Sequence, residues 1–176
     1  MHKAVRSALL ALVLAVGIAP VAASAQAPEP RAHIDVDRFM GRWYEILRTP
    51  NTFQGNCWAA SQVWTRSAPN RFSIAQNCHR GSRTGRLTTT NTSARVIDTA
   101  TNAKWEASFF GGIIRKRYWV IDIAPDYSWM IATTDDGQFP ALLSRSATMS
   151  AAQQAELTAR MGRLGLPTRQ LEPSGH

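Results

Sequence analysis

The sequence predicts an all-β protein: an eight-stranded antiparallel up-and-down barrel with a C-terminal α-helix packed outside. Three observations predict this fold. Eight segments of similar length alternate apolar with polar residues or are rich in β-branched residues. Short turns rich in Gly, Pro, Asn and Asp separate them. One amphipathic segment follows the last of them, and its apolar face needs a surface to pack on.

The elements are expected in the following order. Val36 and Phe39 are three residues apart and indicate a short helical turn over 34–40. The loop 50–56 contains Pro, Asn and Gly, and is expected to cross the open end of the barrel. The expected strands cover residues 43–48, 57–66, 71–79, 86–98, 104–110, 117–123, 128–134 and 138–145.

The longer helix is expected to begin after Ser150, because Ser150 and Gln153 have the spacing of a capping box. It runs to about residue 162, with Leu157, Met161 and Leu164 on one face. That face is expected to pack on the outer surface of the barrel.

The first 25 residues have the pattern of a secretory signal peptide: basic residues, an apolar run over 8–19, and Ala23-Ser24-Ala25. The apolar run is short for a membrane span, so an uncleaved anchor is the less favoured alternative. No cysteine lies near the cleavage region, so no lipid anchor is expected. The expected protein is soluble and periplasmic or secreted, with a signal peptide over 1–25, a flexible leader over 26–33 and one folded domain over 34–172.

The chain is basic, with 20 Lys and Arg against 12 Asp and Glu and a net charge of +8. An exported protein rarely meets nucleic acid, and no nucleic-acid-binding motif is present, so no nucleic-acid partner is expected. Attraction to an anionic membrane surface or an anionic ligand explains this positive charge better. A solvated basic surface without a partner is the alternative.

Cys57 and Cys78 flank a predicted hairpin whose turn is at 67–70, so they face each other across adjacent strands. An even cysteine count in an exported protein favours a disulfide. One difficulty is that Cys78 shares a face with Phe72, whereas Cys57 lies opposite to Trp58. A bulge or a strand end is needed to bring the two thiols together. The alternatives are a metal pair or a reactive thiol at Cys57 beside His79, and two ligands alone do not make a metal site.

Three segments carry a resemblance to a known family: residues 35–46, 108–111 and 143–145, together with Asp126-Tyr127 in a turn. Their order resembles the motifs of the lipocalins, and in particular a bacterial branch similar to apolipoprotein D and the temperature-induced lipocalins. The resemblance covers about residues 34–170. It implies a calyx closed below by Trp43, with Arg145 across the indole ring. Gly41 and Tyr127 are the other expected fold-motif residues.

The resemblance also implies a non-enzymatic binding protein for a small hydrophobic ligand, most often fatty acid or lysophospholipid, with a role in envelope maintenance or stress. Ala124 and Ala141 depart from the residues common in this branch, Asp and Trp, and Ala141 is expected either to widen the pocket mouth or to alter the choice of ligand. The expected partner is one such ligand, with possible contact to an anionic membrane; the protein is expected to be a monomer or weak dimer.

Alternation along the strands predicts which side chains line the calyx. A solid core without a cavity would give the same pattern. The candidate lining residues are Trp58, Ala60, Trp64, Phe72, Ile74, Ala94, Val96, Trp105, Ala107, Phe109, Tyr118, Val120 and Leu142. The candidates for binding a carboxylate or phosphate head group at the rim are Arg95, Arg115, Lys116 and Arg117.

Catalysis has little support in the sequence. It contains no Gly-x-Ser-x-Gly elbow, metal-ligand cluster or phosphate loop, so no catalytic residue, metal or cofactor is expected. Glu45 follows Trp43 by two residues and is expected to face inward, either as an acid with a raised pKa or, preferably, as a hydrogen-bonded structural carboxylate. A pigment or tetrapyrrole ligand, or thiol chemistry at Cys57, are the alternative functions.

Overall fold

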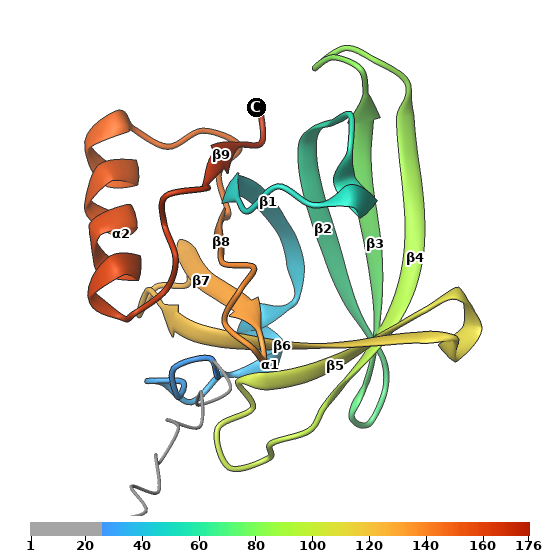
Figure 1. Cartoon of the computed structure of the whole chain (residues 1–176). Helices are drawn as coiled ribbons and strands as arrows, with labels where there is room; N and C mark the ends of the chain where they lie inside the picture. The colour runs from blue at the N-terminus through green and yellow to red at the C-terminus, as the bar shows by residue number, and fades with distance from the viewer. Residues whose placement is uncertain (1–25) are drawn as a thin grey trace, which may run out of the picture.

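The computed structural model describes residues 26–176, and the predicted signal peptide lies outside the described residues. Figure 1 shows a barrel of strands with one helix on its outer side. The helices are α1 (Val36–Phe39) and α2 (Ala151–Arg163), and the single-turn 3-10 helices are η1 (Thr52–Gln54) and η2 (Phe110–Gly112). The strands are β1 (Gly41–Arg48), β2 (Cys57–Ala68), β3 (Arg71–Arg80), β4 (Leu87–Val96), β5 (Lys104–Phe109), β6 (Ile114–Ile123), β7 (Trp129–Thr134), β8 (Ala141–Ser144) and β9 (Glu172–Pro173).

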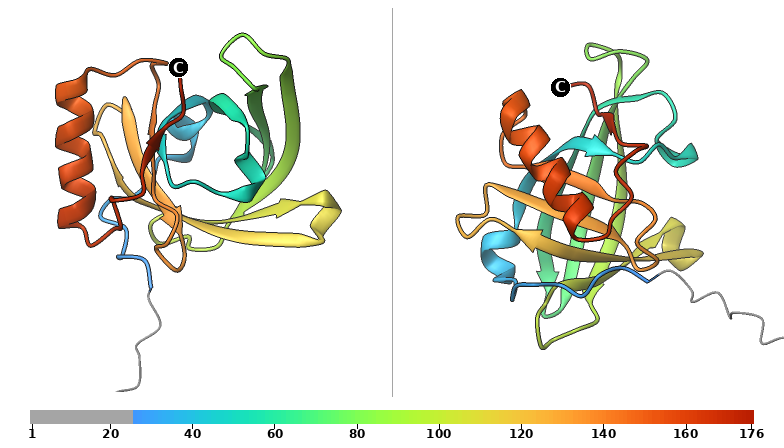
Figure 2. Two further views of the ribbon diagram at one scale, coloured as in Figure 1. Left: turned by 45° about the horizontal axis from the view of Figure 1, so that its top comes forward. Right: turned by 60° about the vertical axis from the view of Figure 1, so that its left-hand side comes forward.

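The sheet is a closed antiparallel barrel, which confirms the predicted fold. Strands β2 to β8 pair in sequence order, β8 pairs with β1, and β1 pairs back to β2. In this topology the connections that contain η1 and η2, together with the β3–β4 and β7–β8 turns, lie at one end. We call this the open end, and Figure 2 shows η1 across the barrel there, as predicted for loop 50–56. The opposite end carries α1 and the remaining turns.

An aromatic floor fills the closed half of the barrel interior. We use this name for the rings of Phe39, Trp43, Trp64, Phe72 and Trp105. The ring centroids of Phe39 and Trp105 are 5.3 Å apart and stacked, and those of Trp64 and Trp105 are 5.1 Å apart and edge-on. Phe72 meets Trp105 edge-on at 4.8 Å. Offset and edge-on contacts of this kind add to the stabilisation from burial alone.

Arg145 closes the floor from below, as the motif resemblance implied. Its guanidinium carbon lies 3.7 Å from the centroid of the Trp43 ring. The same group donates hydrogen bonds to the backbone carbonyls of Arg42, Arg38 and Phe39 at 2.7, 2.7 and 3.1 Å. Gly41 has φ +95°, and a Cβ there would lie 3.4 Å from the Arg145 guanidinium. Glycine therefore suits this position both for its backbone angle and for its close neighbour.

Helix α2 packs on the outer face of the barrel, as predicted. Its Ser150 cap accepts a hydrogen bond from the Gln153 amide, and Leu157 and Met161 are buried against the barrel wall. The outer apolar cluster contains Ile46, Leu47, Trp119, Ile121, Ile131, Leu142, Leu157, Met161 and Leu166. Leu142 was expected to face the calyx, and that prediction is wrong: its neighbours Ala141 and Leu143 point inward, while Leu142 packs under the helix.

Cys57 and Cys78 form the predicted disulfide, with their Cα atoms 5.4 Å apart. A β-bulge in β2 explains how the two cysteines come to lie on the same face although strand alternation placed them on opposite faces. The β2–β3 register shifts between Trp58 and Ser61, and Ala59 in between has φ 47°. Trp58 then lies on the outer face, 41% exposed, so its prediction as a calyx residue is wrong. Gly175 packs directly on its ring.

The C-terminal segment completes the barrel wall between β1 and β2. These strands pair directly only over residues 41–44 and 61–64. Nearer the open end, β9 pairs with Leu47 and Arg48. The Ser174 amide donates to the Ile46 carbonyl of β1, and Ser174 accepts from the amides of Ala59 and Ala60 of β2. This ninth strand was not predicted.

The predicted leader, residues 26–33, runs along the barrel surface. The Ala27 amide donates to the Asp135 carbonyl at 2.9 Å, and the Arg31 amide donates to the Ile121 carbonyl at 3.1 Å. Glu29 forms an ion pair with Lys104 at 2.8 Å. The flexibility of this leader stays a prediction.

Arg145→Ala is expected to lower the free energy of unfolding by about 2–4 kcal/mol, because three charge-assisted hydrogen bonds and the contact with Trp43 are lost together. Urea denaturation followed by tryptophan fluorescence measures this. Arg115→Ala is the matched control, since that side chain is exposed, and it should change the value by no more than about 0.5 kcal/mol. Equal effects of the two substitutions would contradict the role given to Arg145.

Candidate functional site

The candidate site is the inner wall of the barrel above the aromatic floor. Residues directly opposite each other in an antiparallel pair share a face, so the register identifies inward side chains. Thr92 pairs with the inward Ile74, and Thr90 and Thr88 pair with Gln76 and Cys78 on the same face. Gln76, two residues from Ile74 and therefore on the same face, donates to Thr92 at 3.2 Å. The β2–β4 side of this wall is therefore polar.

The β5–β8 side of the same wall is apolar. Phe109, Tyr118, Ala132 and Ala141 are half-buried and pack against the interior cluster. Ala141 is the first residue of β8, near the mouth, and its effect on the width of the mouth stays a prediction. Water reaches the polar side of the upper wall, since Thr90 is exposed and Gln76 is only half-buried. The site thus has one hydrogen-bonding wall and one apolar wall above an apolar floor.

Most of the predicted lining residues do point into the barrel. The interior cluster, including the partly buried side chains packed on it, contains Trp64, Phe72, Ile74, Ala94, Val96, Trp105, Ala107, Phe109, Tyr118 and Val120. Ala60 faces inward by alternation with Gln62 and Trp64, which are hydrogen-bonded to each other at 3.1 Å. Several of these, such as Phe72 and Trp105, belong to the packed floor and not to the upper wall. Their contact with a ligand stays a prediction.

Three of the four head-group candidates are on the wrong side of the barrel. Glu106 lies on the outer face of β5 and forms ion pairs with Arg95 at 3.0 Å, Arg115 at 3.7 Å and Arg117 at 3.9 Å. These arginines therefore cannot bind a head group inside the calyx. Lys116 pairs with the inward Ala107, so it lies on the inner face of β6 towards the open end.

A charged network near the mouth joins the wall to the loop that crosses it. Glu45 is buried and accepts hydrogen bonds from Arg48 at 3.2 Å and from the side-chain amide of Gln54 in η1 at 3.1 Å. Arg48 also donates to Glu172 and to the Cys57 carbonyl. The inward hydrogen-bonded Glu45 was predicted. Arg48 and Gln54 were not, because nothing in their spacing links a strand end to a loop.

Burial raises the pKa of the Glu45 carboxyl, and the hydrogen bonds of Gln54 and the charge of Arg48 act in the opposite direction. Burial likewise raises the pKa of Tyr118, and the nearby Glu45 charge adds to that rise. Glu45 pairs with the inward Leu143 and Tyr118 with the inward Trp105, so both side chains lie on the inner face of the barrel.

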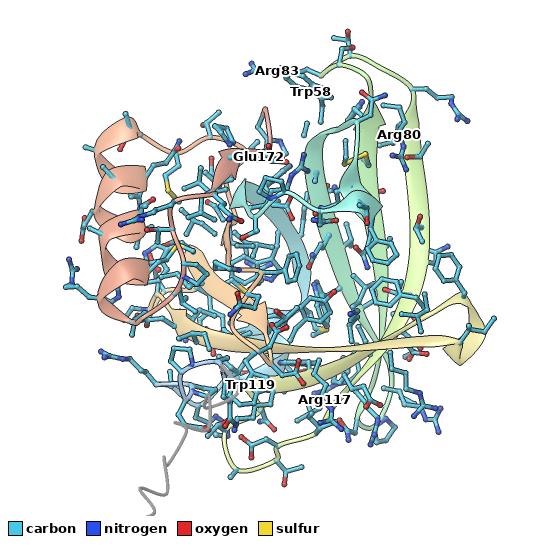
Figure 3. The ribbon with its side chains drawn as sticks, in the orientation of Figure 1. Trp58, Arg80, Arg83, Arg117, Trp119 and Glu172 are labelled. Atoms are coloured by element: carbon cyan, nitrogen blue, oxygen red, sulfur yellow. A yellow bond between two sulfur atoms is a disulfide. The ribbon has the colours of Figure 1, made fainter. Side chains whose placement is uncertain are left out.

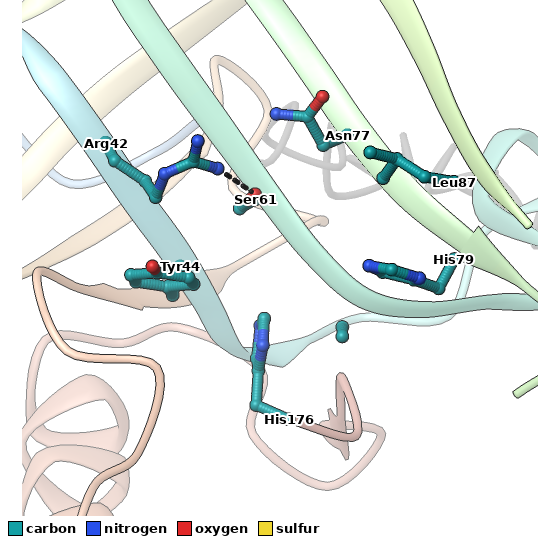
Figure 4. A pocket seen from close by; sticks show the side chains of 8 residues that line it. Arg42, Tyr44, Ser61, Asn77, His79, Leu87 and His176 are labelled. Carbon is teal, nitrogen blue, oxygen red and sulfur yellow. Dashed lines mark hydrogen bonds between the residues drawn. The ribbon is translucent and has the colours of Figure 1, made fainter. Parts of the chain in front are cut away.

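Two pockets lie on the outer wall, not in the calyx. The first, of about 220 Å³, is lined by Arg42, Tyr44, Ala59, Ser61, Asn77, His79, Leu87 and His176. Figure 4 shows its Arg42–Ser61 hydrogen bond. The second, of about 360 Å³, is lined by Gln26, Ile97, Lys104, Arg117, Trp119, Asp135 and Asp136. Figure 3 shows Arg117 and Trp119 together on β6.

In the first pocket Ser61 accepts a hydrogen bond from Arg42, and neither His79 nor His176 is hydrogen-bonded to it. The Nδ1 atom of His79 is 2.9 Å from the Gly85 carbonyl, and the disulfide leaves no free thiol at Cys57, which removes the thiol alternative. Within residues 26–176 no three His, Cys, Asp or Glu side chains gather as a metal site. No helix in that part of the chain is long and apolar enough to cross a membrane.

A family model described as a lipocalin-like domain matches residues 34–175. The chain belongs to the lipocalin family. Among curated proteins it is similar to a putative lipocalin, R877, of Acanthamoeba polyphaga mimivirus, with 33% identity over 60 residues. That match covers 34% of this chain and 36% of the relative, so it spans about a third of the relative's length.

Solved structures place this lipocalin in the same fold. Insecticyanin of the tobacco hornworm Manduca sexta superposes with a TM-score of 0.65 at 14% identity, over 86% of each chain. The amine-binding protein of Rhodnius prolixus, solved as a tryptamine complex, gives 0.59 at 18% identity, also over 86% of each chain. The cockroach allergen Per a 4 gives 0.64 at 14% identity, over 87% of this chain and 96% of the allergen. At these identities the likeness shows the fold alone.

Glu45→Gln is expected to gain stability relative to the wild type as pH rises above about 4.5. With a raised folded pKa, the native state holds the Glu45 proton more tightly than the unfolded chain does. The wild type therefore loses this contribution as pH rises through the folded pKa, and the glutamine variant does not. Denaturant titrations of both proteins between about pH 4 and pH 8 measure the difference. A difference that shrinks with rising pH would show that Arg48 outweighs burial.

Proposed function

We propose that this lipocalin is a non-enzymatic carrier of a single-chain amphiphile, lysophospholipid in the first place and fatty acid in the second. The observation that carries the proposal is the two-sided upper wall. An acyl chain fits the apolar side formed by Phe109, Tyr118 and Ala141, while ester and hydroxyl oxygens face the polar side. The aromatic floor limits how deep the chain can reach.

The polar side separates the two ligand classes. Thr90 and Gln76 supply a hydroxyl and an amide group on the inner wall below the rim, whereas the Thr88 hydroxyl, at the rim, already donates to the Cys78 carbonyl. A fatty acid has polar atoms only at its carboxyl end, whereas a lysophospholipid carries an ester and a glycerol hydroxyl as well. The wall therefore matches a lysophospholipid better, because a buried polar group without a partner is costly.

Lys116 is the proposed partner of the ligand's anionic head group. It lies on the inner face of β6 near the open end, and the inward Ala107 opposite it places it above the packed interior. Arg48 is already bonded to Glu45, Glu172 and Cys57, so it is not free for this role. Export, and a role in maintaining an anionic envelope under stress, would suit such a carrier and remain part of the proposal.

Displacement of a fluorescent fatty acid by palmitoyl lysophosphatidylglycerol and by palmitate tests the proposal. Binding with one ligand per chain is expected for both, and more tightly for the lysophospholipid. Failure of the folded protein to bind either, or a coloured preparation with a pigment at one per chain, would overturn it.

Lys116→Ala is expected to weaken lysophosphatidylglycerol binding about two- to fivefold, which is the loss of one exposed charge contact. Arg95→Ala is the matched control, because its guanidinium is held by Glu106 on the outer face, and it should leave the dissociation constant unchanged. Equal losses in both variants would mean that long-range charge, and not a Lys116 contact, attracts the ligand.

A further inference from the structure

The large apolar side chains exposed to solvent gather at one end of the barrel. Over the described residues, these are Phe53, Trp58, Leu87, Ile97, Phe110, Ile113 and Phe139. Phe53 lies in η1, Phe110 and Ile113 lie in or beside η2, and Phe139 lies in the β7–β8 connection. Trp58 and Leu87 begin strands at the same end. Only Ile97 lies at the closed end, just after β4.

Single exposed apolar residues are ordinary on a protein surface. A group confined to one end, around the mouth of a binding site, marks an interaction surface.

The η2 loop carries two of the exposed apolar side chains of this end. Phe110 is 60% and Ile113 85% exposed, and Phe53 on the neighbouring mouth loop is 68% exposed. Phe109 points into the barrel, while Phe110 takes a positive φ of 51° and Gly111 and Gly112 take 69° and 103°. This backbone turns Phe110 away from the interior. Figure 1 shows η2 projecting at the far end of β5 and β6.

Basic residues stand directly behind the apolar tips. Arg115, Lys116 and Arg117 follow Ile113 on β6. Within residues 26–176, Glu106 is the one carboxylate that forms ion pairs with Arg115 and Arg117, and Asp135 and Asp136 line an outer pocket with Arg117. The β3–β4 turn adds Arg80, Arg83 and Arg86, and residues 80–86 contain no acidic residue. Figure 3 shows Arg80 and Arg83 at the same end as Trp58.

Apolar tips backed by cations match the two layers of an anionic membrane surface. Apolar side chains enter the boundary with the acyl chains, and Lys and Arg remain at the level of the anionic head groups. A second copy of this chain fits less well, because its mouth would bring the same positive charges into contact.

We propose that the open end docks mouth-first on an anionic lipid bilayer, with Phe110 and Ile113 as the inserted tips and residues 115–117 at the head groups. This rests on the proposed function in one respect: docking in this orientation lets a single-chain lipid pass between the bilayer and the calyx without crossing bulk water. The η1 loop, which contains Phe53, then faces the membrane. Gln54 in the same loop donates a hydrogen bond to Glu45 and so connects the loop to the inner wall.

Co-sedimentation of the chain that begins at residue 26 with lipid vesicles tests the docking. Vesicles of phosphatidylcholine alone are compared with vesicles that also contain phosphatidylglycerol. Binding is expected only to the anionic vesicles, and it should weaken as salt is raised. Equal binding to neutral vesicles, or none to anionic ones, would overturn the proposal.

The double variant Phe110→Ser/Ile113→Ser is expected to lower the vesicle partition coefficient about tenfold or more, because two apolar side chains no longer enter the bilayer. Ile97→Ser is the matched control at the closed end and should bind as the wild type does. Vesicle binding by the double variant at the wild-type level would overturn the proposal, as would a wild-type dimer that the double variant abolishes.

Ligand binding without vesicles separates this proposal from the proposed function. Displacement by lysophosphatidylglycerol at submicellar concentration should be unchanged in the double variant, because both tips point away from the interior. Vesicle binding by a protein that binds no soluble lipid would contradict the carrier function and leave the docking intact. Binding of soluble lipid by a protein that binds no vesicles would contradict the docking and leave the carrier function intact.

Discussion

The contact between Arg145 and Trp43 is the interaction on which the closed end of the barrel depends. One guanidinium lies over the indole and binds three backbone carbonyls that lead out of α1 into β1. The indole nitrogen of Trp43 in turn donates to the Phe39 carbonyl at 2.9 Å. This hydrogen bond holds Phe39 against Trp64 and Trp105, so the aromatic floor is closely packed. Any ligand is therefore confined to the upper half of the barrel, where the two walls differ in polarity.

The mouth is built from weaker and more polar contacts than the floor. Strands β1 and β2 separate there, the C-terminal segment fills the gap, and a buried carboxylate holds the crossing loop through Gln54. Segments with few apolar contacts open at lower free energy than a packed core. A rigid closed end and a polar, tethered open end suit a carrier that must take up its ligand and release it from one side.

Alternation along the strands was enough to predict the barrel and most inward residues, because a pleated strand reverses its side chains at every step. It failed where the pairing or the environment breaks that rule. The bulge at Ala59 turns Trp58 outward. Leu142 is apolar on the outer face because α2 covers it. Arg95 lies between the inward Ala94 and Val96, so the two-residue alternation of a strand already places it on the outer face. The prediction that it binds a head group in the calyx did not follow that alternation. Glu45, Arg48 and Gln54 are close in sequence, but their spacing does not indicate that a strand end bonds to the loop after it. Strand β9 pairs with β1 across more than 100 residues, a separation that local patterns do not reveal.

The most direct test of a calyx that binds lipid above a packed floor is a two-dimensional NMR titration of the protein with lysophosphatidylglycerol. The account predicts that amide signals of Gln76, Thr90, Phe109 and Tyr118 shift and saturate at one ligand per chain. The indole signals of Trp43 and Trp64 should move little. Shifts confined to the outer pocket around Arg42 and His176, or an absence of saturable shifts, would contradict it.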